Sequence, residues 1–446
     1  MALSGIEIYK LLPKTNCKDC EFPTCLAFAM KLATKQVELS ACPHVSEESQ
    51  SLLAASSEPP IRLVSLKSDG YEVKAGNEVV LFRHEKTFYN MPGLFIRVTD
   101  EMTSEQIQKK LKPAEEYLVN YVGIDLAVDG YAIESTSNDP TKFKSAVESV
   151  RSVSKKPIVL ICKDPKVIRA GLDVLEGESP LIYAADESNW EEMGEIAKNA
   201  NAPLVVSSPN IDSIAEITEK LKDFGVLNLV LDPANRDLST SLMQFTQIRR
   251  LAIKKDFRPL GYPVIAFPCH APSPETESIQ AAQAITKYAG FIVLETFSPE
   301  ALYALLVLRQ NIYTDPQKPI QVQPGIYEIN DPKPEDPVLV TTNFSITYFS
   351  VANEVEGSGQ PAWLLVSEAE GMSVLTAWAA GNFDAERIAK DVKRFEIADK
   401  VTNKQIVLPG HVSVLSGELE EELPDWDVRV GPREAVDLPA FLKQAL

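Results

Sequence analysis

Residues 15–30 read T-N-C-K-D-C-E-F-P-T-C-L-A-F-A-M, and residues 41–44 read A-C-P-H. These stretches contain four of the six cysteines in the 446-residue chain: Cys17, Cys20, Cys25 and Cys42. Thiolates that are clustered at turn spacing can converge on one soft metal centre. The spacing C-x2-C-x4-C-x16-C therefore predicts that this part of the chain folds around a metal centre.

The residues favour an iron–sulfur cluster at this centre but leave zinc open. Zinc sites with four cysteines usually come from two C-x2-C knuckles, and this stretch has one such pair. Cys42 is followed by proline, as in the Cys-Pro of bacterial ferredoxins, although the x4 spacing differs from theirs. Disulfides are the least expected outcome, because the chain shows no secretory signal.

The remainder of this first module is predicted to be helical. Ser4 can cap a short helix that reaches Leu12, and Pro23 suits the first position of a second helix. Apolar residues recur at helical spacing in that second helix: Leu26, Met30, Ala33 and Val37. We place this domain at residues 1–57. Its C-terminal boundary falls within a predicted linker that reads S-Q-S-L-L-A-A-S-S-E-P-P. So small a unit would depend on its metal centre for stability.

Length and composition limit the other possibilities. A chain of 446 residues is expected to hold two or three domains, and a hydrophobic content of 45% is enough for packed cores. No run approaches the roughly 18 apolar residues of a membrane span, and we expect a cytoplasmic protein. The formal net charge of −19 would repel phosphate backbones, which argues against a nucleic-acid partner.

Residues 58–320 alternate short β-rich runs with amphipathic stretches, which predicts an α/β fold with a (β/α)8 TIM-like barrel. The expected strands are Val79–Phe82, Leu94–Val98, Ile158–Cys162, Leu181–Ala184, Leu204–Val206, Leu227–Leu231, Val264–Phe267 and Phe291–Leu294. The expected helices include Trp190–Asn199, Ile211–Phe224, Ser278–Tyr288 and Pro299–Gln310.

Polar residues follow several of these strands, where a barrel has its functional mouth. They are Asp186, Ser207, Ser208, Asn210, Asp232, Asn235, His270 and Glu295. The alternative is that such residues only cap the helices that follow. Cys162 and Cys269 are predicted to be buried structural thiols.

Residues 321–337 are rich in proline and are predicted to be an extended linker. Residues 338–446 again alternate strands and helices, which predicts a Rossmann-like α/β domain. The expected strands are Val338–Thr341, Ala362–Val366, Ile406–Leu408 and Val428–Val430. Glycine follows three of them and would let backbone approach a large flat ligand at the carboxyl ends.

No G-x-G-x-x-G or G-x4-G-K-[ST] motif occurs, so the sequence disfavours a dinucleotide or P-loop site. His411 follows a strand and Gly410, but Pro409 and Val414 stand where the B12-ligating signature Asp-x-His-x-x-Gly has Asp and Gly. A surface or helix-capping role is therefore expected for His411. No catalytic residues can be assigned.

These features resemble the large (gamma) subunit of the corrinoid iron–sulfur protein of the acetyl-CoA synthase/CO dehydrogenase pathway, over the whole chain. Besides the cysteine module, T-T-N-F-S-I-T-Y-F and G-M-S-V-L-T-A-W-A-A-G carry the resemblance. It implies one [4Fe–4S] cluster on Cys17, Cys20, Cys25 and Cys42. It also implies a base-off corrinoid, a cobalamin-type cofactor without a protein histidine ligand. The residues implied to hold it are Thr341, Thr342, Ile346, Gly371, Met372, Ser373, Val374, Leu375, Thr376, Gly410, Gly431, Pro432 and Arg433.

The resemblance implies a methyl carrier within a corrinoid-dependent methyltransferase system of anaerobic carbon fixation. Cobalt would accept a methyl group from methyltetrahydrofolate through a methyltransferase and donate it to acetyl-CoA synthase, while the cluster would return cobalt(II) to cobalt(I). A smaller barrel subunit would complete a heterodimer. Two other functions remain open: a zinc-stabilised, pterin-binding barrel methyltransferase, and a ferredoxin-like electron-transfer fusion.

Overall fold

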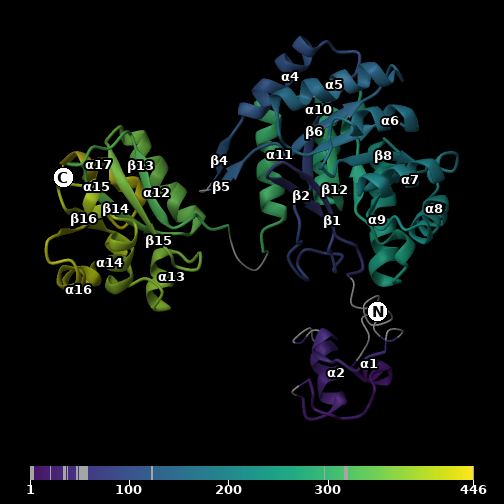
Figure 1. Cartoon of the computed structure of the whole chain (residues 1–446). Helices are drawn as coiled ribbons and strands as arrows, with labels where there is room; N and C mark the ends of the chain where they lie inside the picture. The colour runs from purple at the N-terminus through teal and green to yellow at the C-terminus, as the bar shows by residue number, and fades with distance from the viewer. Residues whose placement is uncertain are drawn as a thin grey trace. The chain divides into compact units, whose positions relative to one another are not determined.

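The structure, a computed structural model, describes residues 5–20, 22–33, 37, 39–46, 49, 59–121, 124–295, 297–315 and 320–444. The chain divides into two compact units, one of Met1–Tyr117 with Ala127–Tyr313 and one of Leu118–Leu126 with Thr314–Leu446 (Figure 1). The predicted cap Ser4 and most of the predicted linker before Pro60 lie outside the described residues.

The cysteine module contains α1 (Gly5–Leu11), α2 (Cys25–Ala33) and the 3-10 helix η1 (Leu39–Ala41). Helix α2 begins at Cys25, two residues after Pro23, and buries Cys25, Phe28 and Ala29. The predicted helix is present, but Leu26 and Met30 of its apolar series are 41% and 45% exposed and do not form its buried face. The buried stripe follows Cys25 at intervals of three and four residues, so the inward thiol fixes which face of the helix is buried.

The central domain is a closed barrel of parallel strands in the order β10-β11-β12-β3-β6-β7-β8-β9, which confirms the predicted fold. Its strands are β3 (Gly93–Thr99), β6 (Gly130–Glu134), β7 (Ile158–Ile161), β8 (Leu181–Ala185), β9 (Leu204–Ser207), β10 (Leu229–Asp232), β11 (Val264–Ala266) and β12 (Ala289–Leu294). Strands of this kind are buried on both faces, which explains their continuous apolar runs. A hairpin of β1 (Val64–Ser68) and β2 (Tyr71–Ala75) packs its apolar side chains into the barrel core.

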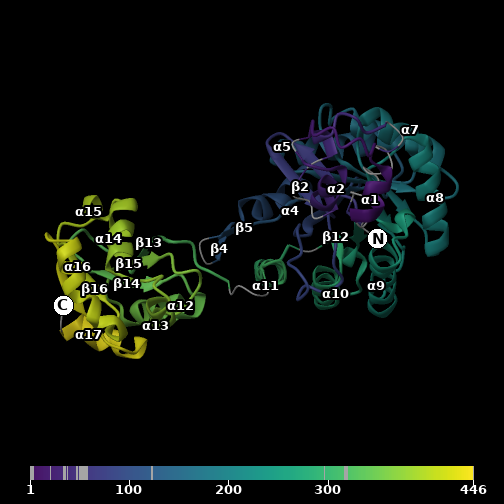
Figure 2. The same ribbon diagram turned by 90° about the horizontal axis from the view of Figure 1, so that it is seen from below.

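Helices surround the barrel, as Figure 2 shows from below. They are α4 (Ser104–Glu116), α5 (Pro140–Val153), α6 (Pro165–Leu172), α7 (Trp190–Ala200), α8 (Ile211–Phe224), α9 (Leu238–Lys254), α10 (Pro274–Thr286) and α11 (Pro299–Ile312), with 3-10 turns η2 (Arg258–Leu260) and η3 (Pro268–His270). Polar side chains cap several of their N-termini, and Asn210 does so for α8 by accepting the Asp212 N–H at 2.9 Å. For Asn210 the capping interpretation is therefore confirmed.

Two barrel elements differ from the prediction. Val79–Phe82 is a loop, because the Val80 carbonyl accepts hydrogen bonds from the Arg249 guanidinium (Nε at 3.1 Å, Nη2 at 2.7 Å) instead of joining a ladder. The missing strand is β6 (Gly130–Glu134), which pairs with β3 and β7. Its first residue is a glycine and its last a glutamate, so it lacked the continuous apolar run that marks the other strands.

The C-terminal domain is built on a five-stranded sheet in the order β13-β15-β14-β16-β17, parallel except for β13. The strands are β13 (Gly325–Ile329), β14 (Val338–Thr342), β15 (Ala362–Ser367), β16 (Gln405–Leu408) and β17 (Asp427–Val430). Strand β13 lies within the segment 321–337 that is predicted as a linker, so residues 325–329 are part of this sheet. The hairpin of β4 (Val119–Tyr121) and β5 (Ile124–Leu126) belongs to the same compact unit, where Tyr121 packs near Phe349.

Alternate residues of these strands enter two different cores, because side chains along a strand point to opposite faces. Val338, Val340 and Leu365 pack under α14 and α16, whereas Leu339 and Leu364 pack under α12 and α17. The helices of the domain are α12 (Ser345–Ser358), α13 (Val374–Ala379), α14 (Ala385–Arg394), α15 (Ile397–Lys400), η4 (Gly410–Leu415), α16 (Ser416–Glu422), η5 (Ala435–Asp437) and α17 (Leu438–Gln444).

Candidate metal centre and cofactor pocket

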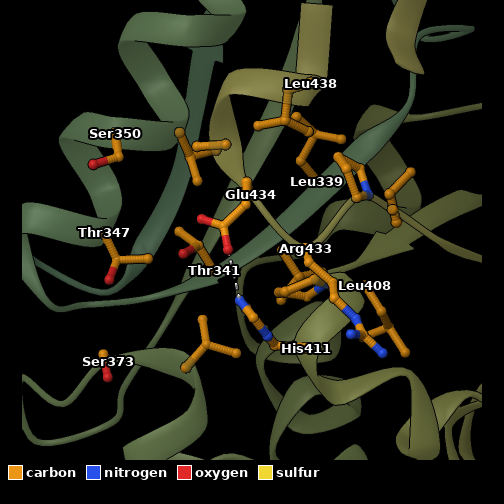
Figure 3. Close-up of a pocket in the computed structure, with 18 of the residues that line it drawn as sticks. Leu339, Thr341, Thr347, Ser350, Ser373, Leu408, His411, Arg433, Glu434 and Leu438 are labelled. Carbon is orange, nitrogen blue, oxygen red and sulfur yellow. Dashed lines mark ion pairs between the residues drawn. The ribbon is translucent and has the colours of Figure 1, made fainter. Parts of the chain in front are cut away.

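A pocket of about 320 Å³ opens at the carboxyl ends of β14 and β16. These two strands are neighbours, but the chain leaves β14 for β15 on one side and reaches β16 and β17 on the other. This is the switch point at which open doubly wound sheets bind their ligands. Figure 3 shows Leu339, Thr341 and Leu408 from the strands, with Thr347, Ser350 and Ser373 from the surrounding elements.

Many of the predicted corrinoid residues line this pocket. They are Thr341, Ile346, Ser373, Val374, Leu375, Gly431, Pro432 and Arg433. The others lie close by in sequence but are not part of the lining: Thr342, Gly371, Met372, Thr376 and Gly410. Met372 is partly buried against the apolar core. Thr342 is fully buried, and its Oγ1, like that of Ser367 on the neighbouring strand, has no hydrogen-bond partner among the described residues.

The structure adds lining residues that the sequence did not single out. They are Leu339, Val340, Thr347, Ser350, Val351, Val407, Leu408, Pro409, Glu434, Ala435 and Leu438. Most of these are ordinary core-type residues of strands and helices. What distinguishes these residues is their position near strand ends at the switch point. That position can be recognised only when the order of the strands in the sheet is known.

One buried hydroxyl group in the pocket wall lacks a partner. Thr341 is 1% exposed, and its Oγ1 has no hydrogen bond to any residue that the structure describes. Buried polar groups are normally paired, and an unpaired one needs an explanation such as a ligand. Thr341 therefore gives the pocket a polar group that is ready for a bound molecule.

Asn343 holds the loop beside the pocket and was missed by the sequence analysis. Its side chain is fully buried; the carbonyl oxygen accepts the N–H groups of Ala369 (2.9 Å) and Gly371 (3.0 Å), and the amide donates to Glu368 (2.9 Å). The loop between β15 and α13 is thus fixed by one side chain from the end of β14. A buried asparagine after a strand is the signal that could have shown this.

The glycines at the sheet edge have an explanation within the chain itself. Gly371 has a φ of +70°, and a Cβ atom there would lie 2.7 Å from Cγ of Gln321. A Cβ atom on Gly410 would lie 2.5 Å from the carbonyl oxygen of Gly431. The positive φ of Gly371 and the backbone contact at Gly410 favour glycine whether or not a ligand is bound, so the two glycines by themselves do not mark the cofactor surface.

His411 lies in η4 and lines the pocket. Its Nε2 is 3.6 Å from a carboxylate oxygen of Glu434, across the opening (Figure 3). The imidazole thus faces a carboxylate of the pocket rim.

The four cysteines of the N-terminal module belong to one small unit: Cys25 and Cys42 are buried in its apolar cluster and Cys20 packs against that cluster. Cys17 lies apart from them at the surface, where its Sγ is within 4.8 Å of ligand atoms of Asp19 and His44. Burial raises the pKa of the Cys42 thiol; a hydrogen bond with the His44 backbone opposes this, and Cys20, Cys25 and Cys17 raise the pKa further. Cys25 and Cys42 are buried, whereas Cys17 is exposed. All six cysteines of the chain are free thiols. Such a group of thiols suits a soft cationic centre that offsets thiolate charge.

Polar contacts connect the segments that carry these cysteines. His44 Nε2 lies 2.5 Å from an Asp19 carboxylate oxygen, which joins the Cys17–Cys20 turn to the segment after Cys42. The Cys25 N–H donates to the Asn16 side chain at 2.8 Å. The two contacts hold the three cysteine-bearing segments together before any metal is considered.

Several of the polar residues that the sequence places after the barrel strands form ion pairs in the mouth with basic residues outside that set. Glu295 forms ion pairs with Arg97 and Lys110, each at 2.6 Å, and Arg97 also contacts Glu134. Asp186 lies 2.8 Å from Lys163. Burial would raise the pKa of Glu134, but hydrogen bonds from His270 and Arg97 lower it below its usual value.

A second network in the mouth surrounds Asp232, which is fully buried. Its carboxylate accepts hydrogen bonds from Arg236 (2.8 and 2.9 Å) and from the Tyr183 hydroxyl (2.8 Å). Cys269, which precedes His270 in the chain, is buried. The His270 ring stacks on the Phe267 ring, with the ring centroids 5.7 Å apart. The expectation that Cys162 and Cys269 are buried thiols is confirmed, at 6% and 7% exposure.

Comparison with known proteins connects these sites. A family model described as "CO dehydrogenase/acetyl-CoA synthase delta subunit" matches residues 63–442, and one described as "Putative Fe-S cluster" matches residues 12–44. The chain is 44% identical to the "Corrinoid/iron-sulfur protein large subunit" of Moorella thermoacetica over 100% of both chains. The chain belongs to the corrinoid/iron–sulfur protein large-subunit family.

Archaeal relatives support this membership. The chain is 35% identical to the "Acetyl-CoA decarbonylase/synthase complex subunit gamma" of Methanopyrus kandleri, over 99% of this chain and 98% of that protein. The family resemblance inferred from the sequence is thereby confirmed, and the match over residues 12–44 includes all four cysteines of the module. Among the described residues, no helix has both the length and the apolar character needed to cross a bilayer.

Proposed function

We propose that this protein carries methyl groups on a corrinoid held by its C-terminal domain, and that its N-terminal module holds a [4Fe–4S] cluster. When bound, the corrinoid supplies a cobalt centre that accepts and donates a methyl group, and the cluster supplies the electron that returns cobalt(II) to cobalt(I). The observation that carries the proposal is the switch-point pocket with the unpaired Thr341 hydroxyl, in a chain of the large-subunit family.

The pocket has the size and chemistry to hold part of a corrinoid. Its 320 Å³ lies at the low end of ligand sites, which span about 300–1,000 Å³. We assign it to the nucleotide tail of a base-off corrinoid, with apolar contacts from Leu339, Val351 and Leu438 and a hydrogen bond from Thr341. The macrocycle would then lie over the loops that begin α13 and follow β17. Leu375 and Trp378, which are 45% and 41% exposed, would be covered by it.

His411 is assigned a role at the pocket rim and not beneath cobalt. Its Nε2 faces Glu434, and the sequence around it lacks the ligating signature. His411→Ala is expected to retain corrinoid. The electron paramagnetic resonance spectrum of the cobalt(II) form should lack nitrogen hyperfine splitting from a protein ligand; splitting that disappears in the variant would overturn this assignment.

The cysteine module would bind its cluster through Cys17, Cys20, Cys25 and Cys42. We expect Cys20→Ala to lose the cluster and keep the corrinoid, because the cysteines and the pocket belong to separate compact units. Reduction of cobalt(II) by an added electron donor should then fail. Normal reduction in this variant would remove the cluster from the mechanism.

The proposed partners follow from the names of the relatives. A large subunit implies a smaller one, which we propose to be a barrel subunit, and the archaeal relatives are named as subunits of an acetyl-CoA decarbonylase/synthase complex. We propose that a methyltetrahydrofolate methyltransferase donates the methyl group and that acetyl-CoA synthase/CO dehydrogenase receives it.

One measurement separates this function from its alternatives. Anaerobically purified protein should contain iron, sulfide and cobalt, and its visible spectrum should show both corrinoid and cluster. Zinc without iron would support the zinc-stabilised barrel methyltransferase, and iron without cobalt would support electron transfer alone. The paired charges of the barrel mouth give no support to a pterin site there.

A further inference from the structure

The β4–β5 hairpin comes from the barrel part of the chain but folds with the C-terminal domain. It follows α4 and precedes β6, yet Leu118–Leu126 forms one compact unit with Thr314–Leu446. We call Leu118–Leu126 the strap. Because of the strap, the chain passes between the two units three times, after Tyr117, after Leu126 and after Tyr313. The barrel and the C-terminal domain are thus joined by three crossings and not by a single linker.

Aromatic side chains attach the strap to the C-terminal domain. Tyr121 packs against the apolar core beneath α12, and its ring centroid lies 6.4 Å from that of Phe349. The series continues through Tyr348 to Tyr327 of β13, with centroids 5.4 and 5.2 Å apart. These separations lie within the range of favourable aromatic pairs, roughly 4.5–7 Å. The strap is therefore held by contacts between side chains, which can open without unfolding the sheet.

On the barrel side, the residues next to the three crossings are fixed. The Tyr117 hydroxyl donates to the Pro299 carbonyl at 3.0 Å. Asp129 accepts a backbone N–H of β3 at 2.8 Å. The Tyr313 ring packs against the Phe88 ring, with centroids 5.6 Å apart. Each crossing therefore starts or ends at a residue that the barrel holds in place.

The crossings differ in how far they can extend. A chain spans at most about 3.6 Å per residue. The two crossings of the strap, 117–121 and 126–129, advance four and three residues, so they reach about 14 and 11 Å. The remaining crossing runs over 313–320, where Ile320 packs against the core beneath α12. It advances seven residues and reaches about 25 Å.

We infer that the strap is a clasp that limits the movement of the C-terminal domain relative to the barrel. While Tyr121 stays against Phe349, the two short crossings hold their anchors within about 11–14 Å. Once the strap comes away from α12, only the longer crossing restrains the domain. Under the proposed function, on which this consequence alone rests, the cofactor domain reaches a distant partner only after the strap has opened.

Hydrogen exchange of the complete protein, followed by mass spectrometry, tests which unit the strap folds with. Leu364 is fully buried in the core beneath α12, and Leu160 is fully buried in the barrel. Leu364→Ala should raise exchange of the strap amides about tenfold and leave α4 unchanged, because amides of one cooperative unit share its opening free energy. Leu160→Ala should do the reverse. A strap that responds to Leu160→Ala, or to neither variant, would overturn the inference.

A second experiment opens the strap directly in the complete protein. Tyr121→Ser removes the ring that contacts Phe349. The matched control, Tyr71→Ser, removes a 46% exposed tyrosine from the β1–β2 hairpin of the barrel unit. A dye on Asn353→Cys, at an exposed position of α12, reports motion of the C-terminal domain through its anisotropy decay. Tyr121→Ser should shorten the slow correlation time about twofold, and Tyr71→Ser should leave it unchanged.

Protection of β14 and β15 from hydrogen exchange shows whether the C-terminal sheet stays intact in these variants. Phe349→Ser removes the same contact from α12, where the ring is 37% exposed, and serves if Tyr121→Ser loses that protection. An unchanged correlation time with the sheet intact would overturn the clasp, as would an equal change in Tyr71→Ser. Neither measurement depends on bound cobalt, so failure of the proposed function would leave both results standing.

Discussion

The barrel mouth and the edge of the C-terminal sheet are both built from the carboxyl ends of parallel strands, yet their polar groups are satisfied in different ways. In the mouth, Arg97 pairs with Glu295 and Asp232 pairs with Arg236. At the sheet edge, the Thr341 hydroxyl is buried without a partner among the described residues, beside a pocket. The carboxyl ends of parallel strands are where a ligand can bind. Whether the polar side chains there are already paired distinguishes the barrel mouth from the sheet edge, which keeps an unpaired hydroxyl beside a pocket.

Closure of the sheet explains this difference. In the barrel, eight strand ends point towards one axis, so side chains from strands far apart in sequence, such as Arg97 and Glu295, come within reach. In the open sheet the connections leave β14 and β16 in opposite directions and separate the flanking helices. A crevice remains there that the side chains of the domain do not fill.

The largest effect is expected from Asp232→Ala in the barrel mouth. It leaves the Arg236 guanidinium beside a buried cavity, and loss of one partner of a buried ion pair costs roughly 3–5 kcal/mol. Chemical denaturation should show this loss, while cobalt content stays at the wild-type value. Asp69→Ala, which breaks an exposed pair with Lys155, serves as the control and should leave the unfolding midpoint unchanged. Loss of cobalt in Asp232→Ala would mean that the mouth takes part in cofactor binding.

Filling the pocket should have the next largest effect. Thr347 lines the pocket from α12 and is half-buried, so a tryptophan there must enter the space assigned to the corrinoid. Overpacking of this kind costs about 1–3 kcal/mol, and we expect Thr347→Trp to lower cobalt content about tenfold or more. Asn353→Trp, at an exposed position of the same helix, should retain cobalt. Equal cobalt in both variants would place the cofactor elsewhere.

A third experiment compares two buried threonines. Thr341→Val removes an unpaired hydroxyl, so the cofactor-free protein should keep its stability while corrinoid binding weakens about fivefold, or ~1 kcal/mol. The Thr218 hydroxyl in the barrel lies 2.7 Å from both the Ala215 and the Pro259 carbonyl oxygens, which share its one proton. Thr218→Val should instead lower stability by about 1–3 kcal/mol and leave cobalt binding unchanged. Titration with corrinoid and thermal unfolding measure the two effects, and identical behaviour of the two variants would contradict the comparison.

The smallest effect concerns pH. Burial raises the pKa of Asp391, and Ser367, Arg387 and Arg394 offset this only in part. Its protonated form is thus favoured in the folded state, and the stability that it contributes is lost as pH rises from about 4 through the raised pKa. Asp391→Asn should raise the thermal midpoint at pH 7 and leave it unchanged near pH 3. A lower midpoint at pH 7 would show that the carboxylate is paired.

The regular elements were largely predictable because buried parallel strands carry continuous apolar runs. Ile211–Phe224 was predicted with its observed bounds. The failures have local causes: Val80 gives its carbonyl to Arg249, and β6 begins with Gly130 and ends with Glu134. In the candidate site, Thr341, Ser373 and Arg433 were predicted, whereas Thr347 and Leu438 were not. The latter have ordinary sequence patterns and line the pocket only because the sheet order brings them to one place.

The sequence by itself determined the cysteine spacing, the alternation of strands and helices, and the family, because each of these depends on residues that lie close together in the chain or on its overall pattern. Only the tertiary structure decided that the charged residues of the barrel mouth neutralise one another while the edge of the C-terminal sheet keeps a pocket. The physical reason is that ion pairs depend on distances between side chains that are far apart in the chain, such as Arg97 and Glu295, and that a pocket depends on which elements meet, as the strand residue Thr341 and the helix residue Leu438 do. Those distances are set by strand order and barrel closure, which no short stretch of sequence contains.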